Sequence, residues 1–300
     1  MAGLASFEGV IAAALTPSRG YLDRLPEYYD FLRRAGVRGF FVLGTWGEGP
    51  RHGVEHRMRV AEKAVESVRS GELAVVHVGS SDMDAVVALL RHANDIGASA
   101  AAAVAPFYYR PDAETLTRYY RRLAELSGIP VLLYNIPSRQ GYSVAPGTLA
   151  SILEDVANVQ GIKDSSGDPA IAVSLVRRFR GRKMVAIGAD RLMLFAFSIG
   201  ARCVVSGLSS VFPELAVELH GAVRRGDAER ALELQELINE ASSLFDSIGL
   251  EMETQRSALR LRGIDLGPSP EPVRPLREEE LSRLRAGVES ILERAGRDPF

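Results

Sequence analysis

Short, continuous runs of apolar residues recur through the first two thirds of the chain, each bounded by glycine, proline or polar residues. Because the apolar residues follow one another instead of alternating with polar ones, both faces of each run are expected to be buried. The pattern predicts strands of a parallel sheet covered by helices. The eight runs are VIAAAL (10–15), GFFVLG (39–44), AVVHVG (74–79), AAAAVAP (100–106), PVLLYNI (130–136), VQGIKD (159–164), MVAIGA (184–189) and RCVVSGL (202–208).

The segments between these runs have the periodicity of amphipathic helices. Eight strands alternating with helices over about 225 residues predict a (β/α)8 TIM barrel. A doubly wound α/β sheet is the main alternative, since it has the same alternation. The expected helices include residues 25–35, 55–69, 83–96, 113–126, 169–179 and 213–225.

The last part of the sequence has a different pattern. Helical periodicity covers residues 227–248 and 277–295, and the Gly/Pro-rich segment GIDLGPSPEPVRP joins them without a strand signal. We therefore expect a catalytic barrel over residues 1–225 and a C-terminal helical region over residues 226–300 that packs against it.

Composition and charge narrow the function classes. With 300 residues, 46% of them hydrophobic and 25% charged, the chain can bury a large core. A formal net charge of −2 gives no broad attraction for nucleic acid or anionic lipid, so neither is an expected partner. No apolar run approaches the roughly 20 residues that span a bilayer, and no export signal is evident.

Cysteine and histidine usage bears on metals and on the compartment. Cys203 is the only cysteine, which excludes an intrachain disulfide and a Cys-based zinc site and favours a cytoplasmic location. His52 and His56 have i, i+4 spacing, but no HExxH motif accompanies them and Gly53 interrupts the helical pattern. No metal site is expected.

In a βα barrel the reactive groups lie where strands end, at the C-terminal mouth. Lys163 lies in the sixth expected strand, and the chain has only two other lysines, Lys63 and Lys183. A desolvated site disfavours the charged ammonium, and the neutral amine is the form that attacks a carbonyl carbon to give an imine. The alternative is a lysine at a strand end that reaches water or pairs with a carboxylate such as Asp164.

Three further positions lie at neighbouring strand ends. Tyr134 ends the fifth expected strand, where its phenol could transfer protons beside Lys163 or merely pack. Thr45 belongs to the loop GTWGEG, whose backbone N–H groups could hold a carboxylate, although the loop taken alone favours an ordinary turn over an anion site. Arg139 could pair with a substrate carboxylate or be solvated at the surface.

Together these segments resemble the dihydrodipicolinate synthase and N-acetylneuraminate lyase family of class I, pyruvate-dependent aldolases. The resemblance covers nearly the whole chain, and YNIPSR followed by GIKD at this spacing is its most specific part. The matching segments are LTP (15–17), GTWGEG (44–49), PFYYRP (106–111), YNIPSR (134–139), GIKDSSG (161–167), IGAD (187–190) and CVVSG (203–207).

The resemblance implies a homo-oligomer, a tetramer or dimer, of TIM barrels with helical C-terminal parts. It implies Lys163 as the Schiff-base lysine and Tyr134 as the proton-transfer residue. Thr45 and Tyr108 would complete the proton relay, with Tyr108 reaching a neighbouring subunit's site. It also implies substrate-binding positions at Trp46, Arg139, Gly188 and Val205, of which Gly188 would lie at the barrel mouth and Val205 would present its carbonyl group.

Trp46 departs from the family pattern, because many members have a second threonine there that holds the pyruvate carboxylate. We expect an indole at this place to reshape the pocket. Similar aromatic residues occur in the hydratase-aldolase branch of the family.

The function implied is that of a Schiff-base lyase acting on pyruvate or another 2-oxo acid, most like the synthase branch that condenses pyruvate with an aldehyde. It needs no cofactor, and its partners are the small 2-oxo acid and aldehyde substrates. Two alternatives remain. One is a 2-keto-3-deoxy sugar acid aldolase or hydratase-aldolase of the same family, and the other is a non-catalytic binding barrel.

Overall fold

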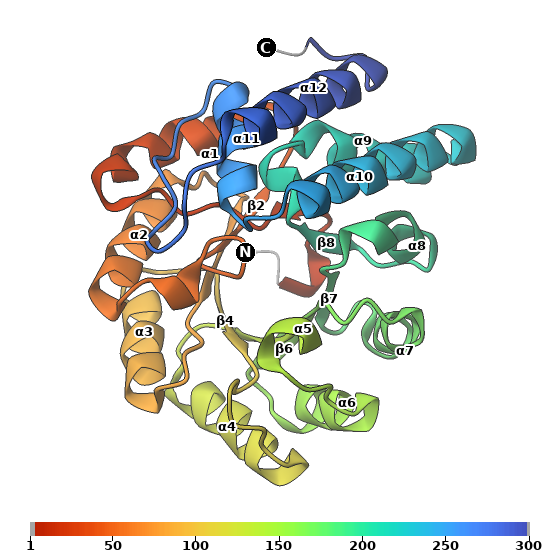
Figure 1. The fold of residues 1–300 in the computed structure, drawn as a ribbon. Coiled ribbons are helices and arrows are strands. Elements are labelled where there is room, and N and C mark those ends of the chain that lie inside the picture. Colours follow the sequence, from red (N-terminus) through yellow and green to blue (C-terminus); the bar gives the residue numbers. More distant parts are fainter. Residues whose placement is uncertain (1–3, 299–300) are drawn as a thin grey trace.

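The computed structural model describes residues 4–298, in which eight parallel strands close into a barrel in sequence order. Figure 1 shows the helices arranged around these strands. Closure of the sheet, with β1 paired to both β2 and β8, confirms the predicted TIM barrel over the doubly wound sheet. The strands are β1 (Gly9–Ala12), β2 (Gly39–Val42), β3 (Leu73–His77), β4 (Ala100–Val104), β5 (Val131–Asn135), β6 (Val159–Asp164), β7 (Met184–Ile187) and β8 (Cys203–Ser206).

A helix follows each strand and covers the outside of the barrel. The helices between and after the strands are α1 (Leu25–Arg34), α2 (Val54–Ser67), α3 (Met83–Asp95), α4 (Ala113–Leu126), α6 (Pro146–Asp155), α7 (Pro169–Phe179), α8 (Met193–Ser198) and α9 (Pro213–Arg225). Aspartates at the N-caps of α3, α4 and α7 accept hydrogen bonds from the first backbone N–H groups, which fixes where these helices begin.

Two hydrophobic clusters form the core. The larger one lies between the strands and the surrounding helices, and the smaller one fills the barrel interior. Interior residues such as Ile11, Phe41, Val75 and Leu132 come from alternate positions of the strands, and their neighbours along each strand face the helices. Burial on both faces explains why the strands appear in the sequence as continuous apolar runs.

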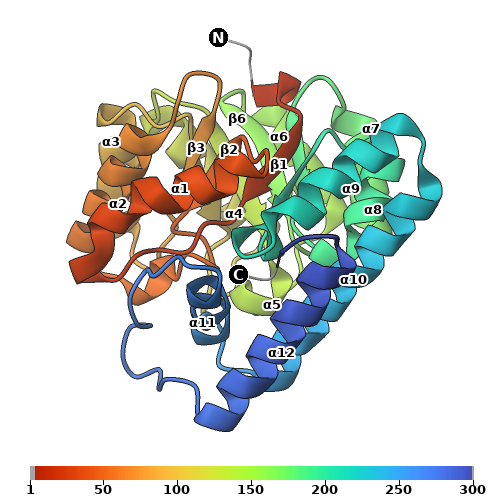
Figure 2. The ribbon, with the colours of Figure 1, turned by 90° about the horizontal axis from the view of Figure 1, so that it is seen from above.

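The C-terminal region consists of α10 (Ala228–Ile248), α11 (Glu253–Leu261) and α12 (Glu278–Arg294). The helix α10 packs along α9 and α12, and α11 lies near the same end of the barrel as the short helix α5 (Pro137–Gln140), as Figure 2 shows. Because α5 directly follows β5, this is the end where the strands terminate. The sequence pattern did not predict α11.

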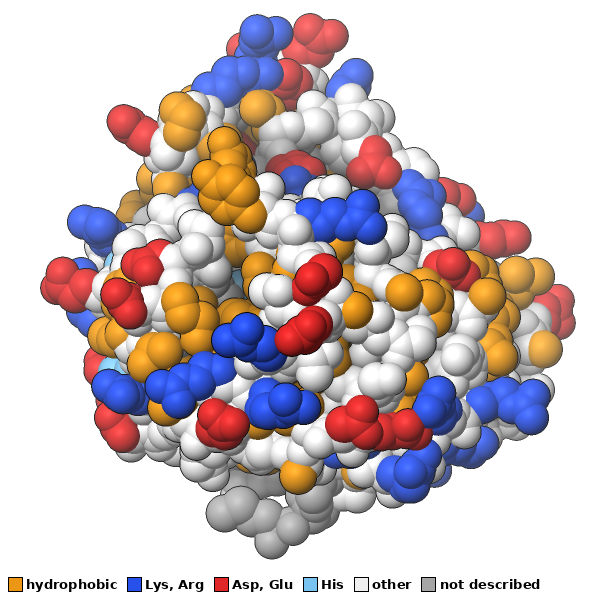
Figure 3. Space-filling view, turned by 90° about the horizontal axis from the view of Figure 1, so that it is seen from below, with side chains coloured by type: hydrophobic (Ala, Val, Ile, Leu, Met, Phe, Trp, Pro, Cys, Tyr) orange, Lys and Arg blue, Asp and Glu red, His pale blue; other side chains and the backbone are white. Residues whose placement is uncertain are grey.

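Surface charge is mixed. Figure 3 shows Lys or Arg and Asp or Glu side chains interspersed over one face of the molecule, without a patch of a single sign. This distribution agrees with the near-neutral formal charge of −2.

Candidate active site

Lys163 lies in β6 with its side chain in the barrel interior. The residue is 4% exposed and is aligned with Tyr134 in the register of β5 and β6. Its Nζ atom lies 4.1 Å from the centroid of the Tyr134 ring and 4.3 Å from that of the Phe41 ring. Both rings belong to the inner core. The amine therefore occupies a site from which the surrounding rings exclude most water.

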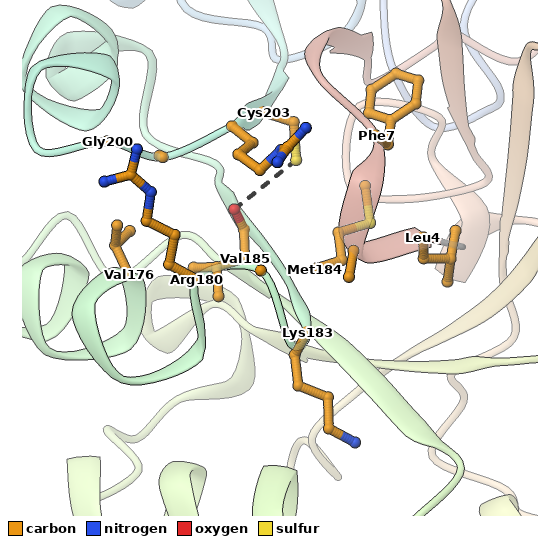
Figure 4. Close-up of a pocket in the computed structure, with 13 residues that line it drawn as sticks. Leu4, Phe7, Val176, Arg180, Lys183, Met184, Val185, Gly200 and Cys203 are labelled. Carbon is orange, nitrogen blue, oxygen red and sulfur yellow. Dashed lines mark hydrogen bonds between the residues drawn. The ribbon is translucent and has the colours of Figure 1, made fainter. Parts of the chain in front are cut away.

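The other two lysines lie outside the barrel interior. Lys63, on α2, forms an ion pair with Asp23 at 3.7 Å. Lys183 precedes β7, beside a small hollow at the opposite end of the strands, and its side chain extends away from that hollow (Figure 4). Its Nζ donates to the Val159 carbonyl oxygen at 2.7 Å. Since the structure describes all three lysines, Lys163 supplies the side-chain amine of the barrel interior.

Tyr134 and Thr45 form a hydroxyl pair next to Lys163. The Thr45 Oγ1 and Tyr134 Oη atoms are 3.1 Å apart, although the two residues are 89 positions apart in the sequence. Tyr134 is 1% exposed, and its ring makes an edge contact with Phe41. Packing thus fixes the phenol while its hydroxyl group contacts a second group that can both donate and accept a proton.

His77 is a site residue that the sequence did not single out. It ends β3 fully buried, and its ring makes an edge contact with the Tyr134 ring, with centroids 5.8 Å apart. Its Nε2 atom accepts the Val104 N–H at 3.3 Å, so Nδ1 carries the proton and donates to the Leu43 carbonyl oxygen at 3.0 Å. Burial holds the His77 pKa well below its usual value. A single polar residue in the run AVVHVG was the only available signal.

A buried polar network joins the ends of β5 and β6. Asn135 Nδ2 donates to Asp164 Oδ1 at 2.7 Å, and Ser166 Oγ donates to Asp164 Oδ2 at 2.7 Å. Gln140 Nε2 completes the network by donating to Asn135 Oδ1 at 3.2 Å. Burial raises the pKa of Asp164 despite these donors. Asp164 is occupied by this network, and among the described residues Lys163 has no ion-pair partner.

A cavity of about 230 Å³ adjoins the hydroxyl pair. Arg139 and Glu251 both line it, and the Arg139 guanidinium donates from Nη2 to Glu251 Oε1. Glu251 lies between α10 and α11, so the C-terminal region contributes directly to the wall. The cavity is lined by Thr45, Glu48, Pro50, Arg51, His77, Val104, Phe107, Tyr134, Ile136, Arg139, Glu251 and Met252.

Gly188, Val205 and Trp46, the other expected substrate-binding positions, do not line this cavity. A Cβ atom at Gly188 would lie 3.1 Å from Lys163 Cε and 2.1 Å from Ser165 Oγ, so glycine leaves the room that the lysine side chain occupies. Val205 lies in β8, and its side chain belongs to the inner core. The Trp46 indole packs on Gly207 and tilts toward Phe245, and Trp46 does not line the cavity.

Tyr108 lies apart from these residues. It is 85% exposed with a φ of 73°, and its ring contacts Tyr109, which is also exposed. Its neighbour Phe107, and not Tyr108, lines the cavity. Within one chain the structure therefore brings together Lys163, Tyr134 and Thr45, and it leaves Tyr108 at the surface.

Residues 4–298 contain no group of three or more His, Cys, Asp or Glu side chains that could hold a metal ion. Within the same range, none of the helices has the length and apolar character needed to cross a bilayer.

Comparison with known proteins places the chain in a family. The model of the dihydrodipicolinate synthetase family matches residues 6–291. A 4-hydroxy-tetrahydrodipicolinate synthase from Methanopyrus kandleri is 32% identical over 294 residues, which cover 95% of this chain and 96% of that one.

Two solved structures share the fold at similar coverage. KD(P)GA from T. tenax is 28% identical with a TM-score of 0.86, over 94% of this chain and 98% of that one. A monomeric dihydrodipicolinate synthase variant is 27% identical with a TM-score of 0.88, over 98% of both chains. From the match over nearly its whole length, we conclude that this chain belongs to the dihydrodipicolinate synthetase family.

Proposed function

We propose that this lyase forms a Schiff base between Lys163 and pyruvate, and that it condenses the resulting enamine with an aldehyde as a 4-hydroxy-tetrahydrodipicolinate synthase does. The observation that carries the proposal is the position of the Lys163 amine in the barrel interior, beside the hydroxyl pair of Tyr134 and Thr45. The name of the Methanopyrus kandleri relative supports the same reaction class.

In the first half of the cycle, the neutral amine of Lys163 attacks C2 of pyruvate and the carbonyl oxygen takes up a proton. Loss of that oxygen as water leaves a protonated imine, which withdraws electrons from C3. Tyr134 Oη transfers these protons, and Thr45 Oγ1 at 3.1 Å relays them toward the cavity.

In the second half, C3 loses a proton to give an enamine, whose carbon then attacks the aldehyde carbon. The new carbon–carbon bond forms as the aldehyde oxygen becomes a hydroxyl group and the imine is restored. Water then hydrolyses the imine and frees Lys163. The protonated imine supplies the electron withdrawal throughout, so the chemistry requires no organic cofactor or metal ion.

The substrate-binding residues follow from the same arrangement. We assign Gly188 and Val205 to the pyruvyl site, because Gly188 adjoins Lys163 and Val205 lies in the same inner core. Arg139 lines the cavity where the aldehyde would enter. Trp46 does not line the cavity, and it shapes the substrate site indirectly through its packing on Gly207.

We further propose that the protein works in the cytoplasm as a homo-oligomer, a tetramer or a dimer. Support comes from Tyr108 and Tyr109, which expose two adjacent aromatic rings at 85% and 79%. In an oligomer, Tyr108 would complete the proton relay of a neighbouring site. A monomeric state is the competing possibility, as in the monomeric synthase variant that shares this fold.

A 2-keto-3-deoxy sugar acid aldolase is the second candidate. The likeness to KD(P)GA supports it. So does Glu251, because a carboxylate in the cavity wall can accept hydrogen bonds from the hydroxyl groups of a sugar-derived aldehyde.

The test is reductive trapping. The protein is incubated with pyruvate and borohydride, and its intact mass is measured. We expect one reduced pyruvyl adduct in the wild type and in Lys183→Ala, and none in Lys163→Ala. Absence of an adduct in the wild type, or its persistence in Lys163→Ala, would contradict the mechanism and favour a non-catalytic binding barrel.

A further inference from the structure

His77 connects three neighbouring strands at the end of the barrel where the proposed hydroxyl groups lie. It is the last residue of β3, which pairs with β2 on one side and with β4 on the other. Its Nδ1 donates to the carbonyl oxygen of Leu43, the residue after β2, and its Nε2 accepts the N–H of Val104, the last residue of β4. The ring therefore links the ends of all three strands.

The ring nitrogens of His77 are not free to react with a substrate, although the residue lines the cavity. Each nitrogen already has a backbone partner, so a proton transfer through the ring would break one of these hydrogen bonds. The ring also packs edge-on against that of Tyr134, with centroids 5.8 Å apart. These contacts are typical of a residue that holds other groups in place.

Arg57, on α2, fixes the backbone of His77 from the helix side. Its Nη2 donates to the His77 carbonyl oxygen at 2.8 Å, and its Nη1 donates to the Gly79 carbonyl oxygen at 3.0 Å. Arg57 is 3% exposed. Burial, together with repulsion from Arg57 and Lys163, lowers the pKa of His77. The ring is thereby kept neutral, which is the form that can accept the Val104 N–H.

Gly79 leaves the space that the ring occupies. A Cβ atom at this position would lie 2.7 Å from Nε2 of His77 and 3.0 Å from the backbone nitrogen of Val104. A side chain at position 79 would therefore displace either the imidazole or the end of β4.

The carbonyl group that His77 binds belongs to the loop that carries Thr45. Leu43 has a φ of 61°, a left-handed conformation that non-glycine residues rarely adopt and that persists where the surrounding structure holds it. The hydrogen bond from His77 is one such restraint, and it acts two residues before Thr45. The Thr45 Oγ1 and Tyr134 Oη atoms are already 3.1 Å apart, and hydroxyl hydrogen bonds weaken beyond about 3 Å. A small shift of the loop would therefore separate the two hydroxyl groups.

We propose that His77 is a positioning residue, which keeps the Thr45 hydroxyl group within reach of Tyr134 by holding the loop at Leu43. This inference rests on the proposed function, and it adds a residue that acts without touching the substrate. The hydrogen bond to Leu43 controls the hydroxyl pair, whereas the hydrogen bond to Val104 holds the end of β4. The two ring nitrogens thus have separable effects.

Two substitutions separate the nitrogens. The side-chain amide of asparagine reaches the place of Nδ1 and can donate to the Leu43 carbonyl oxygen, whereas the longer glutamine places its amide at Nε2 and can accept the Val104 N–H. Each variant keeps one backbone hydrogen bond and loses the other. His77→Asn and His77→Gln should therefore lose similar amounts of stability, which makes each the control for the other.

The measurement is the exchange of the pyruvate methyl protons in D2O, followed by proton NMR. Exchange requires the imine, loss of a C3 proton to give the enamine, and return of a deuteron from the solvent, and it needs no aldehyde. We expect His77→Gln to slow exchange at saturating pyruvate about tenfold or more, with the half-saturating concentration within about twofold of the wild type. His77→Asn should stay within about threefold of the wild-type rate.

A second background tests whether the effect runs through Thr45. Thr45→Val removes the hydroxyl group that His77 is proposed to position. In this background His77→Gln should slow exchange by less than about twofold further, because no hydroxyl group is left to position. A general loosening of the barrel would instead slow exchange by the same factor in both backgrounds.

Asn158→Leu controls for a loss of stability alone. Asn158 precedes β6, at the opposite end of the strands, and its Nδ2 donates to the carbonyl oxygens of Ser127 and Ile129 at 3.0 Å each. This variant should unfold at a lower temperature and exchange pyruvate protons at the wild-type rate. If His77→Gln does not fold, Gly79→Ala displaces the same ring and should slow exchange by a similar factor, whereas an unchanged rate in Gly79→Ala would overturn the role of His77.

Borohydride trapping with pyruvate separates the two proposals. If His77→Gln keeps the adduct at Lys163 and exchanges as fast as His77→Asn, or slows by the same factor in both backgrounds, the role of His77 is wrong and the lyase mechanism stands. If the wild type forms the adduct but exchanges no methyl protons, the hydroxyl pair does not transfer them and the role of His77 is also wrong. If no adduct forms in the wild type, the mechanism fails and this inference fails with it.

Discussion

The Arg256 guanidinium and the Glu48 carboxylate form an ion pair in which both side chains are 1% exposed and Nη2 lies 2.6 Å from Oε2. Arg256 belongs to α11, whereas Glu48 lies in the loop that carries Thr45. The same Nη2 atom donates to the Thr16 carbonyl oxygen at 2.6 Å. The C-terminal region is thereby joined to the loop that supplies one of the proposed catalytic hydroxyl groups.

Removal of this cation is expected to be costly. In Arg256→Met, Glu48 would stay buried with Arg51 as its remaining partner, and we expect a loss of about 3 kcal/mol in the free energy of unfolding. Arg260→Met is the control, because Arg260 lies on the same helix in an exposed pair with Asp265 and should cost less than about 1 kcal/mol. Urea titration measures both. Equal losses would show that the buried pair contributes no more to stability than the exposed one.

Tyr134→Phe removes the phenol oxygen and leaves the ring. We expect kcat to fall by roughly 100-fold or more, the scale of a lost proton-transfer group, with the fold intact by circular dichroism. Tyr120→Phe serves as the control. Tyr120 is also buried, but it lies between the strands and the surrounding helices, where its hydroxyl donates to the Ala103 carbonyl oxygen. That variant should lose about 1 kcal/mol of stability and keep its turnover. A similar kcat for both variants would remove Tyr134 from the mechanism.

Gly207→Ala tests the position of the single tryptophan. The new Cβ atom would lie 2.1 Å from Trp46 Cε2, so the indole must move, at an expected cost of about 1–3 kcal/mol. Trp46→Ala should relieve the clash, giving a double variant that loses less stability than the sum of the two single changes. Gly147→Ala, where nothing lies within 4 Å of the new atom, should be neutral or slightly stabilising. Additive losses in the double variant would contradict the packing.

His52 gives the fold a dependence on pH. Burial, together with repulsion from His56 and nearby arginines, lowers the pKa of His52 to about 4. Between about pH 6.5 and 4 the unfolded chain binds a proton at this residue that the folded chain does not, so stability falls as the pH falls. We expect His52→Gln to lose less stability than the wild type over this interval, as measured by urea titration at several pH values. Parallel curves for both proteins would refute the prediction.

The barrel was predictable from the sequence because its strands are local features. Runs such as GFFVLG show burial on both faces without reference to any other part of the chain. The helix α11 was not predictable in this way. Its residues Thr254, Gln255, Arg256 and Ser257 are polar yet buried, so the polar residues of this segment do not mark an exposed helix face as the prediction assumes.

The candidate site was predictable only in part, for a related reason. Lys163 and Tyr134 are each the last residue but one of consecutive strands, and parallel neighbours bring such residues together. The pairing of Arg139 with Glu251 depends on how the C-terminal region folds back over the barrel, and no local pattern encodes that contact. His77 appeared only as one polar residue within an apolar run.

The scarcity of lysine makes the proposed nucleophile accessible to spectroscopy. A sample grown with carbon-13 lysine contains three labelled side chains, and only that of Lys163 lies over the faces of two aromatic rings. Ring currents from Phe41 and Tyr134 should displace its resonance from those of Lys63 and Lys183. One spectrum in the resting state and one with a keto acid would then follow a single atom through imine formation, in the unmodified protein and without mutagenesis for assignment.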